Sequence, residues 1–421
     1  MKRLVAVALL VLSFSAGVSA GPFDRGPYSG APDAESIVIC WTGSPPMAGK
    51  VEIASAAAYA KSATFERAIA VPVPSSDRAG TEVRIDDLAQ ATAYVYRATV
   101  QSGSETYVSP MGRFRTSPAA GDPVRFAVVS DTQWQWEGEN RLAALGAAVA
   151  ADASTSPFDF VLHAGDLVES PAGDYWDHWF SSFEPMLLAA PFIPVLGNHE
   201  KNSRSYYDAF PHPPGAGQND ERWWALHWGD VVVVGLDTSA SRADRILEQQ
   251  AWAEKELSGP ERHKFVIFHH PVYSSDAYHG SGYGYETIYH PIFVETGVDL
   301  VLNGHAHNYE RIVRDDITYL VLGGGGAVPR GLAPKHVDGS IVAVEGRNFY
   351  ARVSTARKGI SVDVVSVAEA SETSFTLTSN QLLDSFFLPC EPERPSIPWA
   401  TLAALAALVG VLLWAVIRSH R

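Results

Sequence analysis

The sequence predicts two folded domains, an all-β sandwich followed by an α/β domain, and an apolar helix at the C-terminus. Residues 33–117 contain short strand-like runs separated by Gly, Pro, Ser and Asp, which is typical of an all-β fold. Residues 122–367 combine apolar runs that lack alternation with helical stretches, which is typical of an α/β fold. A chain of 421 residues also exceeds the size that one hydrophobic core usually serves.

The first domain is expected to form a β-sandwich beside the second. Its strands are predicted at 36–42, 50–55, 81–88, 93–101 and 106–116. In the fourth of these runs Tyr94, Tyr96 and Ala98 share one face, which is the period of two expected of a half-buried strand. We interpret the domain mainly as a packing and spacing module, with a role as a wall or lid beside a functional site as the alternative.

The second domain follows a linker at 118–123 and carries the residues suited to chemistry. Its helices are predicted at 140–152, 177–189, 245–258 and 286–296. Five of its apolar runs end in Asp, Asn or His, namely Asp131, Asp166, Asn198, His269 and the pair His305 and His307. Open α/β sheets place functional residues beyond the carboxyl ends of such strands, so the five termini predict one site.

The pair His305 and His307 follows an apolar run at 298–302 and suggests a metal centre. Imidazole is the commonest metal ligand of intermediate softness, and one turn can aim two rings at neighbouring ions. A pair of this kind is weak evidence in isolation. Four other apolar runs also end in residues that can bind a metal. Five such endings would rarely arise by chance, so they support a metal centre.

These motifs together resemble the calcineurin-like metallophosphoesterase superfamily, and most of all its purple acid phosphatase branch. The similar motifs are Asp131-Thr132-Gln133, Gly165-Asp166, Gly197-Asn198-His199-Glu200, His269 with Pro271 and Tyr273, Gly304-His305-Ala306-His307 and Asn308-Tyr309-Glu310-Arg311. The resemblance implies a four-layer domain over 122–367, with two packed sheets flanked by helices. It also implies a fibronectin type III-like module over 33–117. The pattern formed by Trp41, Leu88 and Tyr94 resembles the pattern of such modules.

The resemblance further implies two metal ions and a ligand for each position around them. Asp166 is expected to bridge the ions, with Asp131 and His307 on one ion and Asn198, His269 and His305 on the other. Carboxylates combined with imidazoles suit Fe, Mn or Zn better than Mg alone. His270 is the alternative to His269, although Pro271 and Tyr273 favour His269.

Two further histidines are expected to face the substrate. His199 follows Asn198 and is predicted to stabilise the phosphoryl oxygens or to protonate the leaving alkoxide. The alternative is that His199 orients a metal ligand through a hydrogen bond and does not contact the substrate. His279 lies in the loop 274–285, where purple acid phosphatases also place substrate-facing histidines; an ordinary solvated side chain is the alternative.

Two positions depart from the family pattern at the first ion. Purple acid phosphatases carry a Tyr where this chain has Glu169, and the wider superfamily carries a His where it has Gln133. Either residue is a candidate auxiliary ligand through an oxygen atom. Glu169 is alternatively expected to orient a catalytic imidazole. The protein is not expected to be purple.

The two ends of the chain predict export and anchoring. Residues 1–20 have the basic start, apolar stretch and small-residue end of a signal peptide. Its removal would leave 30 basic residues against 47 acidic ones, a net charge of −17, which argues against nucleic acid as a partner. Residues 368–397 are predicted to form a stalk, and the uncharged run 399–417 a transmembrane anchor that contacts the membrane. A removable C-terminal sorting signal is the alternative for this run.

The sequence thus predicts an exported, membrane-anchored, binuclear phosphoesterase that hydrolyses phosphomonoesters by attack of a metal-bound hydroxide. A phosphodiesterase or nucleotide hydrolase on the same site is the nearest alternative. A catalytically silent surface binding protein is the alternative from another class, because the first ion lacks its usual ligands.

Overall fold

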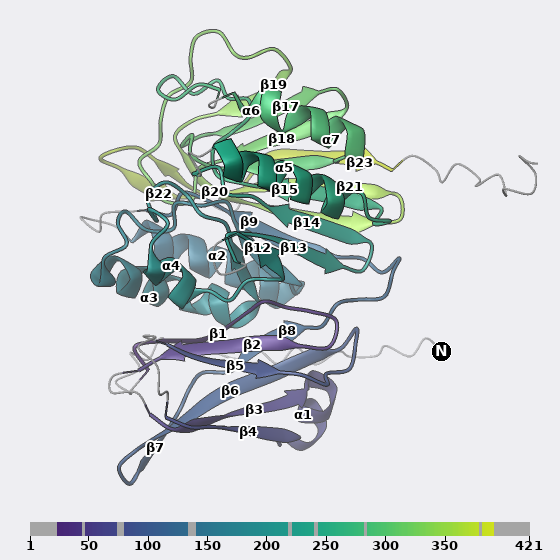
Figure 1. Ribbon diagram of the computed structural model, residues 1–421. Helices are drawn as coiled ribbons and strands as arrows, with labels where there is room; N and C mark the ends of the chain where they lie inside the picture. Colours follow the sequence, from purple (N-terminus) through teal and green to yellow (C-terminus); the bar gives the residue numbers. More distant parts are fainter. Residues whose placement is uncertain are drawn as a thin grey trace, which may run out of the picture.

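The computed structural model shows two domains stacked end to end (Figure 1). The structure describes residues 23–43, 47–73, 80–133, 140–217, 221–239, 243–281, 284–378 and 381–390. The expected signal peptide at 1–20 lies outside these residues, so export stays a prediction.

The first domain is a β-sandwich of two antiparallel sheets. One sheet has the order β1 (Arg25–Gly30), β2 (Ile37–Thr42) and β5 (Thr81–Ile85). The other has the order β4 (Arg67–Val71), β3 (Gly49–Ser55), β6 (Ala93–Ser102) and β7 (Glu105–Val108), with β8 (Gly112–Arg115) also paired to β6. Side chains such as Ile37, Trp41 and Tyr96 fill the space between the sheets. A short helix, α1 (Ala56–Ser62), follows β3. Kinship of this sandwich with fibronectin type III modules stays a prediction.

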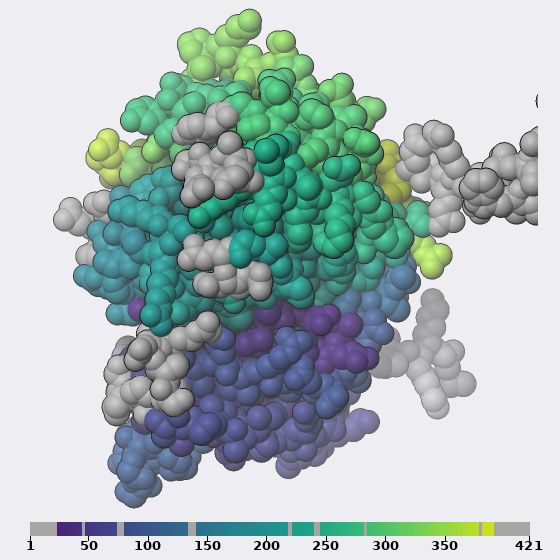
Figure 2. Space-filling model, in the orientation of Figure 1, coloured from purple at the N-terminus to yellow at the C-terminus, as the bar shows by residue number. Residues whose placement is uncertain are grey.

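One hydrophobic cluster spans the contact between the sandwich and the second domain. Tyr28 and Cys40, from β1 and β2, belong to the same buried cluster as Trp176 and Phe180 of helix α3 (Gly173–Ala189). The rings of Tyr28 and Phe180 lie 5.0 Å apart between centroids. Figure 2 shows the purple N-terminal strands in continuous contact with the larger domain. The two domains are therefore joined by packing as well as by the chain.

The second domain contains two large sheets. The first has seven strands, in the order β11 (Phe192–Pro194), β10 (Phe160–His163), β9 (Arg125–Val129), β20 (Arg347–Ala356), β21 (Gly359–Ala370) and β22 (Phe375–Leu377), with β23 (Leu382–Pro389) on β21. The second has eight, in the order β12 (Gly215–Ala216), β13 (Trp223–Trp228), β14 (Val231–Gly235), β15 (His263–Ile267), β16 (Leu300–Asn303), β18 (Ile317–Leu322), β17 (Tyr309–Arg314) and β19 (Ser340–Val344).

The two sheets pack face to face, and helices cover their outer faces. Phe126 of the first sheet and Phe265 of the second meet with ring centroids 5.4 Å apart in the shared core. Helices α2 (Arg141–Thr155) and α3 pack on the first sheet, while α5 (Ala243–Leu257) and α7 (His290–Thr296) pack on the second (Figure 1). Two short helices, α4 (Arg204–Ala209) and α6 (Tyr285–Ile288), lie in the connections. The order helix, sheet, sheet, helix matches the α/β part of the predicted fold.

The predicted C-terminal transmembrane helix is not supported and is corrected here. Across the ranges that the structure describes, no helix is both long enough and apolar enough to cross a membrane. Residues 399–417, on which the prediction rested, lie outside those ranges.

Candidate metal centre

The sequence-predicted ligands come together where the carboxyl ends of the two sheets meet. Strands β9, β10 and β11 are mutually parallel in the first sheet, and β14, β15, β16 and β18 are parallel in the second. The backbone N–H of His305 donates to both carboxylate oxygens of Asp131 at 2.9 Å, which ties the end of β16 to the end of β9. Nδ1 of His269 donates to the Ala164 carbonyl at 2.9 Å, which ties β15 to β10. Both sheets therefore contribute to one site.

The backbone at this site is held in an unusual conformation. Asp131, Asp166 and His305 have φ values of 54°, 57° and 67°, in the left-handed region that L-residues rarely occupy. Each such residue costs on the order of 1–3 kcal/mol and persists only when its surroundings enforce it. Gly197 and Gly304 are needed for close approach, because a Cβ at either would overlap the carboxylate of Asp166 or Asp131.

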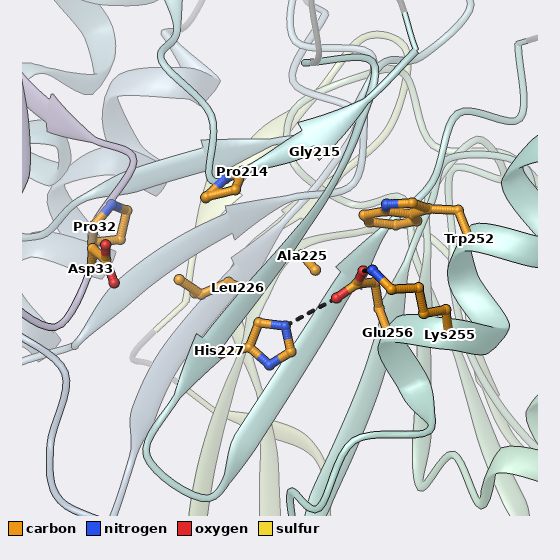
Figure 3. Close-up of a pocket in the computed structure, with 10 residues that line it drawn as sticks. All are labelled: Pro32, Asp33, Pro214, Gly215, Ala225, Leu226, His227, Trp252, Lys255 and Glu256. Atoms are coloured by element: carbon orange, nitrogen blue, oxygen red, sulfur yellow. Dashed lines mark hydrogen bonds and ion pairs between the residues drawn. The ribbon is translucent and has the colours of Figure 1, made fainter.

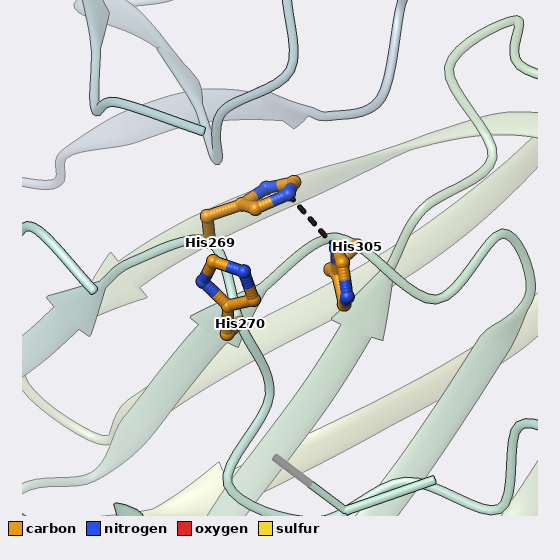
Figure 4. Close-up of side chains that lie close together, drawn as sticks. All are labelled: His269, His270 and His305. Atoms are coloured by element: carbon orange, nitrogen blue, oxygen red, sulfur yellow. Dashed lines mark hydrogen bonds between the residues drawn. The ribbon is translucent and has the colours of Figure 1, made fainter. Parts of the chain in front are cut away.

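Three other predicted ligands converge on Nε2 of His269. This atom lies 3.1 Å from Asp166 Oδ2 and 3.1 Å from Asn198 Oδ1. It also lies 3.2 Å from His305 Nδ1, a contact that Figure 4 shows. Because Nδ1 of His269 donates to a backbone carbonyl, the opposite ring nitrogen, Nε2, faces the cluster. A backbone partner on the far nitrogen is the usual arrangement of a metal-binding histidine.

A second group forms on the other side of Asp166. Nε2 of His307 lies 3.5 Å from Asp131 Oδ1, and the Nδ1 of the same ring donates to the Val328 carbonyl at 2.8 Å. Gln133 belongs to this second group, with its amide nitrogen 3.2 Å from His307 Nε2 and 3.3 Å from Asp166 Oδ2. Its Oε1 is buried without a hydrogen-bond partner. Since the two ends of an amide interchange by a flip of the side chain, this oxygen can face a cation at the same place.

Two triplets of side chains could each hold a metal ion. They are Asp131, Asp166 and His269, and His269, His270 and His305, with one ligand atom from each residue within 4.8 Å of the others. His270, the alternative to His269, is thus near the cluster, but its Nδ1 lies 2.9 Å from the Thr238 hydroxyl. His269 is the one that faces the Asp166 carboxylate, so the geometry favours His269.

The electrostatics of the cluster favour a cation. Burial would lower the pKa of His269, but the carboxylates of Asp166 and Asp131 raise it to about 9. Burial opposes the ionised form of Asp166, yet His269 holds the pKa of this carboxyl well below its ordinary value. Burial raises the pKa of Asp131. Two buried carboxylates therefore stabilise a positive charge between them, and the donor set fits a metal ion.

His199 is oriented toward the cluster from the third motif. Its N–H donates to Asp166 Oδ1 at 2.9 Å, and its ring Nδ1 donates to the backbone carbonyl of Glu169 at 2.8 Å. The Glu169 carboxylate lies 3.8 Å from the same Nδ1, and the opposite nitrogen lies 3.8 Å from Asp166 Oδ2. Burial lowers the pKa of His199, but Asp166 and Glu169 raise it above its ordinary value overall. Of the two roles considered for Glu169, the structure therefore favours orienting the imidazole.

His279 lies at the rim of the cluster. Its ring centroid is 3.9 Å from that of His305, and the loop that carries it is fixed by the Asp276 carboxylate, which accepts the N–H of His279 at 2.7 Å. His279 is partly exposed, as a residue that faces a substrate would be.

Glu200 has a structural role that the sequence did not reveal. Its buried carboxylate accepts the N–H groups of Gly197, Asp166, Leu167 and Val168 at 2.7, 3.0, 2.7 and 3.3 Å. Burial and the charge of Asp166 raise the pKa of Glu200 to about 7, while the backbone N–H groups act to lower it. The side chain clamps the loops after β10 and β11. The only signal for it in the sequence was its place in the third motif.

A separate hollow lies away from this cluster. It has a volume of about 330 Å³ and is lined by residues including Asp33, Leu226, Trp252 and Glu256 (Figure 3). None of the predicted site residues lines it. The hollow is therefore separate from the predicted metal centre.

Comparison with known proteins agrees with the α/β fold of the second domain. The double-sheet fold is similar to that of a solved purple acid phosphatase. Residues 124–309 match the family model of calcineurin-like phosphoesterases. This part of the chain is therefore similar to calcineurin-like phosphoesterases, and the matching relatives include purple acid phosphatases.

The relatives include several plant phosphatases. Purple acid phosphatase 1 of Ipomoea batatas is 27% identical over 253 residues, which cover 55% of this chain and 51% of the relative. Phosphoenolpyruvate phosphatase of Allium cepa is 28% identical over 200 residues, which cover 42% of this chain and 41% of the relative. The chain thus spans about half the length of the curated relatives it matches.

Solved structures share the fold at low sequence identity. A purple acid phosphatase, PPD1, from yellow lupin seeds superposes with a TM-score of 0.70 at 18% identity, over 86% of this chain and 74% of that one. A structure of PhoD superposes with a TM-score of 0.66 at 15% identity, over 90% of this chain and 95% of that one.

Proposed function

We propose that the protein is a binuclear, metal-dependent phosphoesterase that hydrolyses phosphomonoesters. The observation that carries this proposal is the position of Asp166, whose carboxylate lies between the His269 side and the Gln133 side of the cluster. A shared carboxylate is what two adjacent ions need. The plant phosphatases among the relatives support the same reaction class.

The residues that would hold the ions follow from the two sides of the cluster. Asn198, His269 and His305 would hold one ion, and Asp131, His307 and the Gln133 oxygen the other. Bound there, two ions supply Lewis acidity toward the phosphate and lower the pKa of water. Fe, Mn or Zn suits this mixture of carboxylate, amide and imidazole ligands.

Metal dependence is the direct test of this proposal. Hydrolysis of p-nitrophenyl phosphate by the purified protein is expected after loading with Fe, Mn or Zn, and chelation is expected to abolish it. Bound metal is counted by elemental analysis of the same samples, and bis-p-nitrophenyl phosphate tests the diester alternative. A protein that binds stoichiometric metal but turns over neither substrate would contradict the proposed phosphoesterase activity. A protein that binds no metal would favour the alternative of a catalytically silent surface binding protein.

We further propose that His199 donates a proton to the leaving alkoxide. The hydrogen bond to the Glu169 carbonyl fixes the ring, so the opposite nitrogen faces the position beside Asp166. Positioned general acids contribute about 10²–10⁴-fold in rate.

His199→Gln is therefore expected to lower kcat by roughly 10²-fold on an alkyl phosphate. The loss on p-nitrophenyl phosphate is expected to be smaller, because p-nitrophenolate leaves without protonation. The measurement is kcat on both substrates at equal metal content. An equal loss on both substrates at unchanged metal content would show that His199 stabilises the phosphoryl oxygens instead, and a loss of bound metal would show that it holds a ligand.

A further inference from the structure

The backbone around Arg330 is fixed to two of the predicted ligands. Arg330 follows the glycine loop after β18. In this segment the N–H of Ala327 donates to the Asp131 carbonyl at 3.0 Å, and His307 Nδ1 donates to the Val328 carbonyl at 2.8 Å. The N–H of Arg330 itself donates to the His307 carbonyl at 3.0 Å. Three hydrogen bonds thus fix the position of the Arg330 backbone relative to the metal centre.

The guanidinium of Arg330 lies on the same wall of the site as His279. Its central carbon is 5.0 Å from the centroid of the Tyr278 ring. The rings continue inward, with 4.8 Å between the centroids of Tyr278 and His279 and 3.9 Å between those of His279 and His305. Burial and the positive charge of Arg330 both lower the pKa of His279, which agrees with their proximity. The rings of Tyr278 and His279 therefore connect the guanidinium of Arg330, through successive contacts, to the predicted ligand His305.

Arg330 has no anionic partner among the residues that the structure describes. The side chain is half-buried, and its Nη1 is buried without a hydrogen-bond partner. The Glu345 carboxylate, nearby in the sequence, accepts the N–H of Leu332 at 2.8 Å and makes no ion pair with Arg330. Buried cationic groups are normally paired, so an unpaired guanidinium beside a reaction centre points to an anion that arrives from outside.

We propose that Arg330 binds a second anionic group of the substrate while the scissile phosphate occupies the metal centre. This rests on the proposed function and narrows it to phosphate esters that carry a nearby carboxylate or a further phosphate. A planar guanidinium binds either group through two parallel hydrogen bonds. The contact with the Tyr278 ring helps to position the guanidinium, whose Nη1 has no hydrogen-bond partner in the described residues.

Binding of non-hydrolysable ligands tests the proposal without requiring turnover. Calorimetry on the metal-loaded protein compares methylphosphonate, which has one anionic group, with phosphonoacetate and methylenediphosphonate, which have two. The wild-type protein is expected to bind at least one of the latter about 10- to 100-fold more tightly, and Arg330→Gln is expected to lose most of that preference. The two ligands distinguish a carboxylate from a second phosphate. Metal content is measured after each titration.

Matched variants separate a specific effect from a general one. Arg347→Gln removes an arginine that pairs with Glu369 at 3.0 Å, and it is expected to keep the preference. Arg330→Lys keeps the positive charge but cannot form two parallel hydrogen bonds, so its preference for ligands with two anionic groups is expected to be intermediate. This variant also replaces Arg330→Gln in the test if Arg330→Gln does not fold. An absent preference in the wild type, or one that survives in Arg330→Gln, overturns the proposal. Intact preference in a protein without hydrolysis would overturn the proposed function alone.

Discussion

Asp166→Asn is expected to lower kcat/KM on phosphomonoesters by roughly 10³-fold or more. The substitution replaces the one carboxylate that faces both sides of the cluster with a neutral amide. Two ions could then no longer share an anionic ligand, and metal catalysis supplies several kcal/mol of transition-state stabilisation. The number of bound ions is expected to fall as well. The measurements are steady-state kinetics and elemental analysis.

The matched control for this change is Asp177→Asn. Asp177 pairs with Arg25 at the surface, at 2.6 Å, with 61% of its side chain exposed. Exposed pairs contribute little to stability, so this variant is expected to keep wild-type activity. If Asp166→Asn kept two ions and wild-type turnover, Asp166 would not be the bridging ligand.

Glu200→Gln is expected to lower the free energy of unfolding by about 3 kcal/mol. The carboxylate accepts four backbone N–H groups, and the glutamine amide would turn its own NH₂ donors toward some of them. Those buried N–H groups would lose their acceptor, and the loops that carry Asp166 and Asn198 would lose their common anchor. Metal affinity is expected to fall with stability, because the loops position these ligands.

Chemical denaturation of Glu200→Gln beside Glu372→Gln provides the comparison. Glu372 is exposed, so its substitution is expected to change stability by less than about 0.5 kcal/mol. An equally small change in Glu200→Gln would show that the four hydrogen bonds do not stabilise the fold.

The sequence predicted the α/β architecture and the meeting of the candidate ligands, for a physical reason. Parallel strands present their carboxyl ends at one edge of a sheet, so Asp131, Asp166 and Asn198 had to lie together once their runs were strands. Ligand roles stay predictions until metal binding is measured. Strand β1 was not foreseen, because Arg25–Gly30 lacks alternation and its conformation depends on pairing with β2 and packing on α3.

The environments of Glu200 and Arg330 could not be read from the sequence. The four N–H groups around Glu200 come from two loops whose approach depends on tertiary packing. The position of Arg330 depends on hydrogen bonds to Asp131 and His307 from the segment that follows the glycine loop. Gln133 was recognised as a departure from the family pattern, but only the structure placed its amide between Asp166 and His307.

The left-handed backbone at Asp131, Asp166 and His305 has a consequence for how ions would be captured. Their unfavourable conformations are imposed by the double-sheet core, so the free-energy cost is incurred when the chain folds. An arriving ion would meet side chains that are already aimed, and little of its binding energy would be consumed in ordering loops. The stability of the double-sheet core therefore also determines how well the ligands are positioned before an ion binds. In a chain with a less stable core, these residues would relax to ordinary backbone conformations, and the ions would bind more weakly.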